Sequence, residues 1–557
     1  MQFCLSSSAQ TAIKSGLFRA RAASSSSRTS IPAGARRRPV STSASSAAAV
    51  SSGKKDYDTL CEKLQEISTL NGVSGLLGWD EQVMMPPGAA GVRSKQSSVL
   101  AGITFEKSSA PELGDILNRL NEDVQSKGED FTATELAVIR DASRNYRKTT
   151  VLTKDIAQRS AELTSKGYQS WVKARQESDF SLFAPMLEDW VSLLKEKCAL
   201  IDDSKPVYDV CLDDYERGLT AARLDEVFAQ VKAGLVPLLD DIRTKGTAPD
   251  RSWLDGEFDV TAQANMCADI AKDMGFSTEC GRLDVSVHPF TGGAHPSDVR
   301  MTTRFKANDL TEGLTGAVHE TGHALYEQGR NLEYDGLPVN EALSMGIHES
   351  QSLLWERMVC LRPAFSEYLL PKMKASFPQL KQDATPQQLY RALNVVKTPS
   401  LIRVESDEVT YPMHIIMRYE MERALMEGKV GVKDLPDLWN VKMHDYLGCK
   451  PKTHAEGVLQ DVHWSVGAIG YFPTYSLGAM YACQIYQAAS KDLPSLEADI
   501  ASGKFGELKG WLNERVHKVG SFYPSGDLLM EQVTGAPLDP SIFLAYLKDK
   551  YTPLYKL

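Results

Sequence analysis

The sequence predicts a mainly α-helical protein, with a large two-lobed body and a small antiparallel β element. At 557 residues the chain is longer than one hydrophobic core normally organises, so more than one lobe is expected. Apolar residues recur at helical spacing over most of the chain, with short polar joins and no repeat of fixed period. Two short stretches, 282–290 and 298–305, instead alternate apolar and polar residues as strands do.

Charge and cysteine usage narrow the class of protein. The formal net charge is −10, and the nine Lys and Arg of residues 1–55 stand without any acid, so the remainder carries about −19. A strongly acidic body argues against a nucleic-acid partner. The nine cysteines include no CxxC pair, which suits a reducing compartment and excludes a cysteine-ligated zinc finger of the usual spacing.

Residues 1–52 have the composition of an organelle transit peptide. They are rich in Ser, Ala and Arg, lack Asp and Glu, and contain no apolar run long enough for a secretory signal. The richness in serine favours a chloroplast, with a mitochondrion as the alternative.

Helices are expected from residue 56 to about residue 280. The first has Leu60, Leu64, Ile67 and Leu70 on one face and is expected to end at Asn71-Gly72, ahead of a turn at 86–88. All ten histidines lie at or beyond His288. Residues 53–280 are therefore expected to be a helical scaffold or groove wall, with any histidine chemistry in 281–557.

The two alternating stretches are expected to form an antiparallel pair, with the segment TGGAHPS at 291–297 as the turn between them. Such a pair can be purely structural, or its edge can hold an extended peptide by backbone hydrogen bonds.

The segment AVHETGHALYEQG at 317–329 contains the pattern HExxH. Thr311 offers an N-cap, Glu312 offers a first-turn acid, and Gly329 stands where the helix would stop. Residues four apart share a helix face, so His319 and His323 can reach one Zn²⁺ while Glu320 lies beside the catalytic water as a general base. The alternative is a surface helix with two solvated histidines.

A hydrolytic zinc site needs a third protein ligand. A third histidine in the extended pattern HExxHxxGxxH is excluded, because Tyr326 and Gly329 occupy the glycine and histidine positions. A later helix, expected from Glu341 to Leu361, supplies Glu349 as the predicted ligand. The alternatives are His348, Glu341 and Glu356, and His348 is otherwise expected to form an outer hydrogen bond.

The segment 462–490 is long and free of Asp, Glu, Lys and Arg, but Pro473 and three glycines interrupt it. It predicts a buried helix pair rather than a membrane span.

Several separated motifs together resemble those of the carboxypeptidase Taq family of metallocarboxypeptidases. In order along the chain they are WDEQVMMPPGA near residue 79, HPF at 288–290, DVRMT at 298–302, HETGH at 319–323, HESQ at 348–351, IRVESD at 402–407 and GVLQDVHW at 457–464. The likeness covers nearly everything from residue 55 onward. Ser406 replaces an alanine of the family, and Arg217 replaces a proline.

The resemblance implies a metallocarboxypeptidase domain over residues 53–557, which removes single residues from the free carboxyl end of peptides with broad preference. It implies a homodimer with a deep groove, one Zn²⁺ per chain held by His319, His323 and Glu349, and Glu320 as the general base. Cobalt is implied as a possible substitute for zinc.

A carboxypeptidase also needs a cation for the terminal carboxylate of its substrate and donors for the oxyanion. We expect Arg403 to supply the cation, with Arg300 as the second choice. Candidates for the oxyanion donor are Tyr411, His414 and His463, while His288 could line the groove. Asp461 either orients His463 or a neighbouring group, or is a buried structural acid.

Two other functions remain open, an endopeptidase or aminopeptidase with the same site and a catalytically idle zinc-stabilised scaffold.

Overall fold

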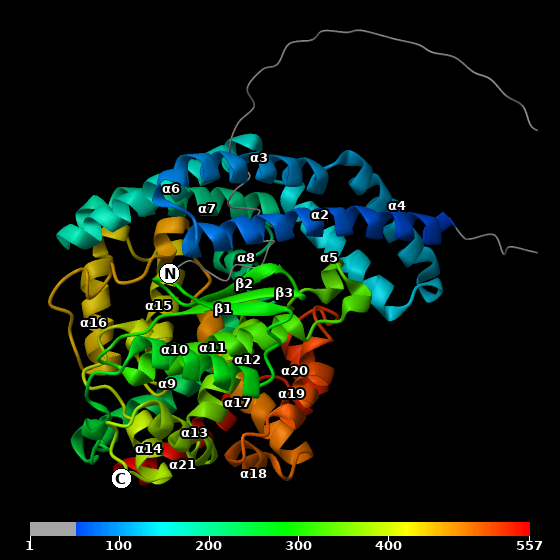
Figure 1. Ribbon diagram of the computed structural model, residues 1–557. Helices are drawn as coiled ribbons and strands as arrows, with labels where there is room; N and C mark the ends of the chain where they lie inside the picture. The colour runs from blue at the N-terminus through cyan, green and yellow to red at the C-terminus, as the bar shows by residue number, and fades with distance from the viewer. Residues whose placement is uncertain (1–51) are drawn as a thin grey trace, which may run out of the picture.

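The computed structural model describes residues 52–557, so nearly all of the predicted transit peptide lies outside the described residues. Helices dominate the chain, and the three-stranded sheet lies beneath the long first helix (Figure 1). The helices before the sheet are α2 (Ser52–Val83), α3 (Ala90–Ser108), α4 (Pro111–Lys127), α5 (Ala133–Thr150), α6 (Lys154–Glu177), α7 (Ala184–Ile201), α8 (Val207–Asp213), α9 (Ala221–Thr244) and α10 (Val260–Asp273).

Helix α2 continues through Asn71-Gly72, so the predicted helix end at this position was wrong. The glycines of α2 allow close packing and do not end the helix. A Cβ atom on Gly72 would lie 2.4 Å from the carbonyl oxygen of Ala294, and one on Gly75 would lie 2.3 Å from that of Gly293. Bare backbone therefore lets α2 lie directly on the strand that contains these carbonyls.

The sheet contains β1 (Gly281–Val285), β2 (Phe290–His295) and β3 (Asp298–Thr303) in the order β1-β3-β2. Strand β2 pairs antiparallel with β3, but β1 pairs parallel with β3. The two stretches expected to pair antiparallel thus run in the same direction, and the segment expected to be their turn is mostly the strand β2. Its glycines read as a turn in the sequence, but in the fold a Cβ on Gly293 would lie 2.2 Å from the carbonyl oxygen of Asp298 in β3, and one on Gly292 would meet open space. Glycine is thus required at Gly293 for the close pairing of β2 with β3.

The helices after the sheet are α11 (Leu310–Gln328), α12 (Met345–Leu353), α13 (Pro363–Ser376), α14 (Pro386–Leu393), α15 (Tyr411–Met426), α16 (Leu435–Leu447), α17 (Pro473–Asp492), α18 (Leu496–Ala501), α19 (Gly506–Leu512), α20 (Gly526–Thr534) and α21 (Pro540–Tyr555). Helix α11 ends where Gly329 predicted, but its N-cap is Asp309 rather than Thr311. The predicted helix 341–361 begins later, at Met345, and continues after α12 as the π-helix Leu354–Cys360.

The segment 462–490 is buried, as predicted, although its first part is only the short 3₁₀ helix His463–Val466, followed by α17. Among the helices of residues 52–557, none is long and apolar enough to cross a membrane.

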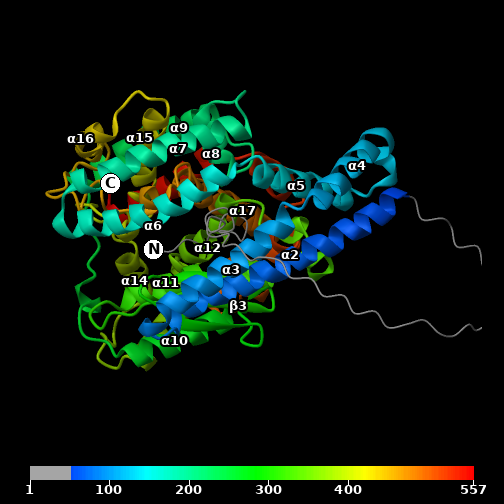
Figure 2. The same ribbon diagram turned by 90° about the horizontal axis from the view of Figure 1, so that it is seen from above.

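One large hydrophobic core extends from Ile156 to Tyr555, and a smaller one joins α2, α4 and α5 to Leu337 and Val339. In the view from above, α2 and α3 run along one side and α6 and α7 along the other, with α12 and α17 between them (Figure 2). Arg217, which stands where the resembling family has proline, lies in the connection between α8 and α9. It donates to Asp141 of α5 at 2.8 Å, and Asp141 also accepts from Ser521 at 2.7 Å.

Candidate metal centre

Two glycines bring the helices of the metal centre into close contact. Gly322 of α11 faces α12, where an added Cβ would lie 2.5 Å from the carbonyl oxygen of Gln351. Gly478 of α17 faces Glu349, whose Cγ and Cβ would lie 2.7 and 2.8 Å from an added Cβ. The side chain of Glu349 is therefore enclosed between α11 and α17 and points at the histidines of α11.

His319, His323 and Glu349 form a group that could hold a metal ion, since one donor atom of each lies within 4.8 Å of the others. The Oε2 atom of Glu349 is 3.3 Å from Nε2 of His323 and 3.7 Å from Nε2 of His319. Donor atoms bound at about 2.0–2.2 Å to one Zn²⁺ must lie within ~4.4 Å of each other. Two imidazoles and one carboxylate therefore fit a single ion at this place, and these are the three residues predicted as ligands.

In each histidine of the group, the ring nitrogen that faces away from Glu349, Nδ1, lies within hydrogen-bond distance of another side chain. Nδ1 of His319 lies 2.7 Å from Oε2 of Glu356, and Nδ1 of His323 lies 2.6 Å from Nδ1 of His348. If Nε2 of His323 donates its lone pair to a metal, Nδ1–H must donate to His348, which then carries its proton on Nε2. That nitrogen lies 2.7 Å from Oε1 of Glu327, so the chain of hydrogen bonds ends on a carboxylate.

Glu356 and His348, which were considered as alternative ligands, thus contact the Nδ1 atoms of the two histidines and do not join the donor group itself. Glu341 caps the short 3₁₀ helix Pro338–Asn340 and does not join the group of donor atoms.

The carboxylates of the centre are held in their charged form. Burial would raise the pKa of Glu349, but attraction to His319 and the hydrogen bond with His323 lower it to about 2. The pKa of Glu327 is also lowered to about 2, because attraction to Arg330 and the contact with His348 exceed the effect of burial. Both groups are therefore anionic at neutral pH, as a ligand and an outer acceptor need to be.

Glu320 is 5% exposed, and its carboxylate has a hydrogen-bond donor from the sheet. The hydroxyl of Thr291, on β2, donates to Oε2 of Glu320 at 2.7 Å. Sequence reasoning missed Thr291 because it stands first in the segment expected to be a turn. One carboxylate oxygen of Glu320 is thereby oriented by the sheet.

Replacing Glu356 by glutamine is expected to weaken metal binding about 10- to 100-fold. The amide is nearly the same size but removes the negative charge that orients and polarises His319. Competition with a chelating dye would measure the dissociation constant, with exposed Glu405→Gln as the matched control. Equal affinities for the two variants would contradict this role.

Gly478→Ala is expected to displace Glu349, because the new methyl group would overlap its Cβ and Cγ. We expect a loss of about 1–3 kcal/mol in the free energy of unfolding together with weaker metal binding. Gly102→Ala on α3 is the control, since its Cβ would meet open space. Denaturant titration with and without metal would separate the two effects, and a Gly478→Ala protein with normal stability and affinity would show that α17 can move aside.

Arg403, the predicted carboxylate-binding residue, lies in a buried charge cluster. Its Nε and Nη2 lie 2.9 and 2.8 Å from Oδ1 of Asp461, and Arg418 binds the other oxygen at 2.7 Å through Nε. Arg403 is 2% exposed and Arg418 is fully buried. Burial would raise the pKa of Asp461, but both arginines hold it well below its usual range. Two guanidinium groups on one carboxylate leave the cluster with a net positive charge.

Tyr411 and Tyr475 are close enough to both Arg403 and the predicted metal ligand Glu349 for the two charges to act on them. Their ring centroids are 6.1 Å apart, and the Arg403 guanidinium lies 4.9 Å from the Tyr475 centroid. For both tyrosines, burial and the charge of Glu349 raise the pKa, while Arg403 lowers it. Both phenols are therefore protonated at neutral pH and able to donate.

Two of these neighbours were not found from the sequence, Tyr475 and Arg357. Arg357 lies in the π-helix with its guanidinium 4.5 Å from the Tyr411 ring centroid, and its Nη1 has no hydrogen-bond partner among residues 52–557. A π-helix often occurs at a functional site, but it has no sequence pattern that would have revealed it.

The remaining candidates lie around or outside this arrangement. His463 is buried, with Nε2 3.3 Å from the hydroxyl of Tyr475, and His414 is buried with Nε2 3.1 Å from Oγ of Ser400. Burial lowers the pKa of both histidines well below the usual value, so both are neutral.

Arg300 and His288 belong to the region of the sheet. Arg300 is paired with Asp298 at 2.8 Å and stacked on Trp79 at 4.4 Å, and neither partner belongs to the metal group. His288 is exposed between β1 and β2, and its pKa is lowered to about 4, mainly by partial desolvation. The structure therefore brings Arg403, and not Arg300, to the buried positive cluster.

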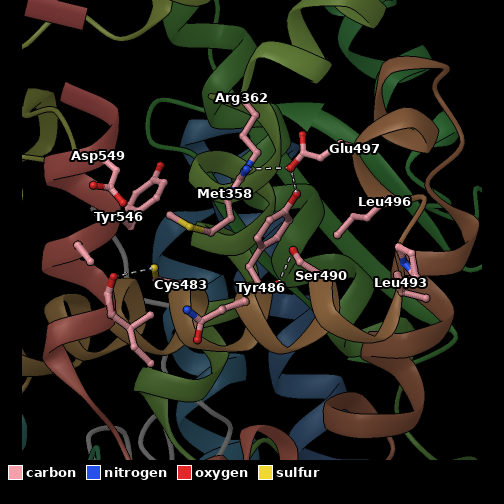
Figure 3. Close-up of a pocket in the computed structure, with 14 residues that line it drawn as sticks. Met358, Arg362, Cys483, Tyr486, Ser490, Leu493, Leu496, Glu497, Tyr546 and Asp549 are labelled. Carbon is pink, nitrogen blue, oxygen red and sulfur yellow. Dashed lines mark hydrogen bonds and ion pairs between the residues drawn. The ribbon is translucent and has the colours of Figure 1, made fainter. Parts of the chain in front are cut away.

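A separate cavity of about 390 Å³ is lined by α17, α21 and the segment around Arg362 (Figure 3). Its arginine is already paired, because Arg362 lies 2.8 Å from Glu497 and 4.4 Å from the Tyr486 ring centroid. None of the metal-centre residues lines this cavity, so it supplies no group to the site.

The fold and the site define a metal-dependent peptidase, with two histidines and a glutamate around one position and a second glutamate beside them. The family model of the carboxypeptidase Taq (M32) metallopeptidases matches residues 59–551, and the chain belongs to this family. It is accordingly an enzyme, a metallocarboxypeptidase.

Known relatives resemble this chain in sequence or structure over almost their full lengths. Thermostable carboxypeptidase 1 of Thermus thermophilus is 38% identical over 90% of this chain and 99% of its own. Carboxypeptidase 1 of Bacillus subtilis is 36% identical over 89% of this chain and 97% of its own. The crystal structure of the M32 carboxypeptidase from Deinococcus radiodurans R1 superposes with a TM-score of 0.86 at 34% identity, over 90% of this chain and all of that one.

Proposed function

We propose that this protein is a zinc-dependent carboxypeptidase that releases single amino acids, with broad side-chain preference, from the free carboxyl end of peptides. The observation that carries the proposal is the buried, net-positive cluster of Arg403, Arg418 and Asp461, whose Arg403 acts on the same two tyrosines, Tyr411 and Tyr475, as the predicted metal ligand Glu349. A peptide with a free terminus carries a carboxylate one residue away from its last peptide bond. A cation that binds this carboxylate distinguishes an exopeptidase from an endopeptidase.

The donor set favours zinc. Imidazole nitrogens suit Zn²⁺ and Co²⁺ better than Mg²⁺, which prefers six oxygens, so cobalt is the expected substitute. A bound zinc ion supplies a Lewis acid, which makes water more acidic and polarises the scissile carbonyl.

The residues of the chain carry out the other parts of the reaction. Glu320 takes a proton from the attacking water and delivers it to the leaving amine, and the Thr291 hydroxyl holds Oε2 of Glu320 in place. Tyr411 and Tyr475, whose phenols stay protonated, donate hydrogen bonds to the oxyanion. His463 contacts the Tyr475 hydroxyl, so it orients this donor and does not contact the oxyanion itself. Arg403 binds the terminal carboxylate.

Two peptides that differ only at the carboxyl end test this proposal. The full chain, loaded with zinc, is incubated with the free peptide and with its amide, and the products are identified by mass spectrometry. Stepwise loss of residues from the free peptide alone, abolished by a chelator and restored by zinc or cobalt, supports the proposal. Equal cleavage of both peptides, or release from the amino end, would assign an endopeptidase or an aminopeptidase instead.

The composition of residues 1–52 supports import into the chloroplast, with the mitochondrion as the alternative. Fusion of these residues to a fluorescent protein would show the destination, and a cytosolic signal would overturn the proposal.

We further propose a homodimer, on the resemblance to the family alone. Sedimentation of the full chain at several concentrations would test it.

A further inference from the structure

Two buried cysteines face each other at the joint between α7 and α8. Cys198 is near the end of α7, Cys211 is in α8, and residues 202–206 connect the helices. Both are free thiols, 3% and 4% exposed, and their Sγ atoms are 3.5 Å apart. A disulfide has an S–S distance of about 2.05 Å, so the two sulfurs need to approach by only about 1.5 Å.

Charged groups surround the pair. Lys197 precedes Cys198 and lies 3.2 Å from Oδ2 of Asp214, and Lys148 lies 2.8 Å from the other oxygen of that carboxylate. The hydrogen bond from Cys211 lowers the pKa of Cys198, and attraction to Lys197 lowers it further, while the pKa of Cys211 is raised. Cys198 is thus the better nucleophile, and Cys211 is placed to react with it in a second step.

The pair lies directly before a segment that supports the metal centre. Helix α8 runs into Tyr215 and Glu216, and the backbone nitrogen of Met345 donates to the Tyr215 carbonyl at 2.9 Å. The backbone nitrogen of Gly346 donates to Oε2 of Glu216 at 3.1 Å. Met345 and Gly346 are the first residues of α12, the helix that contains Glu349. A bond that holds α8 in place therefore also holds in place the residues to which the start of α12 is hydrogen-bonded.

We propose that Cys198 and Cys211 form an oxidation site, which a peroxide converts into an intramolecular disulfide that fastens α8 to α7. The Cys198 thiolate attacks one peroxide oxygen, so that an S–O bond forms, the O–O bond breaks, and the released hydroxide becomes water. The sulfur of Cys211 then attacks Cys198, so that the S–S bond forms and the S–O bond breaks. The second hydroxide leaves with the Cys211 proton, and two thiols are oxidised while the peroxide is reduced to water.

A peroxide is the fitting oxidant because the thiols are buried. It is small and leaves no bulky adduct on the sulfur, whereas exchange with a larger disulfide would pass through a mixed disulfide on a sulfur that is only 3% or 4% exposed. The product closes a short loop, which stabilises the fold mainly by restricting the unfolded chain.

The test treats the folded full chain with hydrogen peroxide, removes the excess with catalase, denatures the protein and alkylates all thiols. We expect the peptide spanning 198–217 to lose two hydrogens and to escape alkylation, while the buried Cys267 and Cys360 are alkylated as before. The denatured thiol count should fall from nine to seven. The melting temperature should rise by about 2–5 °C and return when a reductant is added.

Cys198→Ser and Cys211→Ser are treated in parallel, and neither should show the mass loss or the rise in melting temperature. Alkylation of both cysteines after treatment, a link to some other cysteine, or a rise that persists in Cys198→Ser would overturn the proposal. Methionine oxidation does not confuse the mass result, because residues 198–217 contain no methionine. None of these measurements uses peptidase activity, so the outcome is independent of the proposed function.

Discussion

Glu320→Gln is expected to lower kcat by about 10²- to 10⁴-fold while the protein continues to bind its metal. Glutamine has nearly the same shape and can still accept the Thr291 hydroxyl through its amide oxygen, but it cannot take a proton. The three ligands and their outer partners remain intact, so the metal content of the purified variant should match that of the unchanged protein. Steady-state kinetics on a free peptide and elemental analysis measure the two quantities.

Thr291→Val provides a graded control for this result. It removes the hydroxyl that orients Oε2 but leaves the charge of Glu320, so kcat should fall by less than in Glu320→Gln. If Glu320→Gln kept more than about a tenth of kcat, the proton transfer would have to be assigned elsewhere. If instead the variant lost its metal, the residue would be structural.

The approach of His319, His323 and Glu349 to one another could be predicted because it follows mostly from helical periodicity and from the number of donors that a zinc ion needs. The positions of His319 and His323 on one helix face follow from helical periodicity, and the third ligand follows from counting donors and from the HESQ motif. Distance along the chain did not prevent this, since Glu349 lies thirty residues after His319 and still points at it.

The predictions that failed depended on contacts between distant segments. Gly72 reads as a helix stop and the glycines of β2 read as a turn, yet Gly72 packs against the backbone of Ala294 in β2, and Gly293 packs against Asp298 in β3. Thr291 was missed for a related reason, because its segment was expected to be a turn, whereas it is a strand that directs the Thr291 hydroxyl at Glu320. The parallel pairing of β1 with β3 is likewise decided by tertiary packing, since alternation alone does not fix strand direction.

The prediction for Arg403 also changes once its neighbours are known. The sequence suggested a lone arginine that meets a carboxylate, whereas the structure shows an arginine already bound to Asp461 beside a second arginine. Removing Arg403 would leave Arg418 and Asp461 as a balanced pair, so the variant should fold. It would also remove the net positive charge, which is the property that a substrate carboxylate needs.

Arg403→Ala should therefore lower kcat/KM for free peptides by roughly 30- to 4000-fold, the equivalent of about 2–5 kcal/mol. Arg403→Lys should recover only part of this, because an ammonium group keeps the charge but cannot bind a carboxylate through two parallel hydrogen bonds. Arg300→Ala is the matched control, and we expect it to change kcat/KM little. The affinity of an amidated peptide as an inhibitor should hardly change in Arg403→Ala, because this ligand has no terminal charge. A large loss in Arg300→Ala, with Arg403→Ala unaffected, would transfer carboxylate recognition to the sheet beside α2.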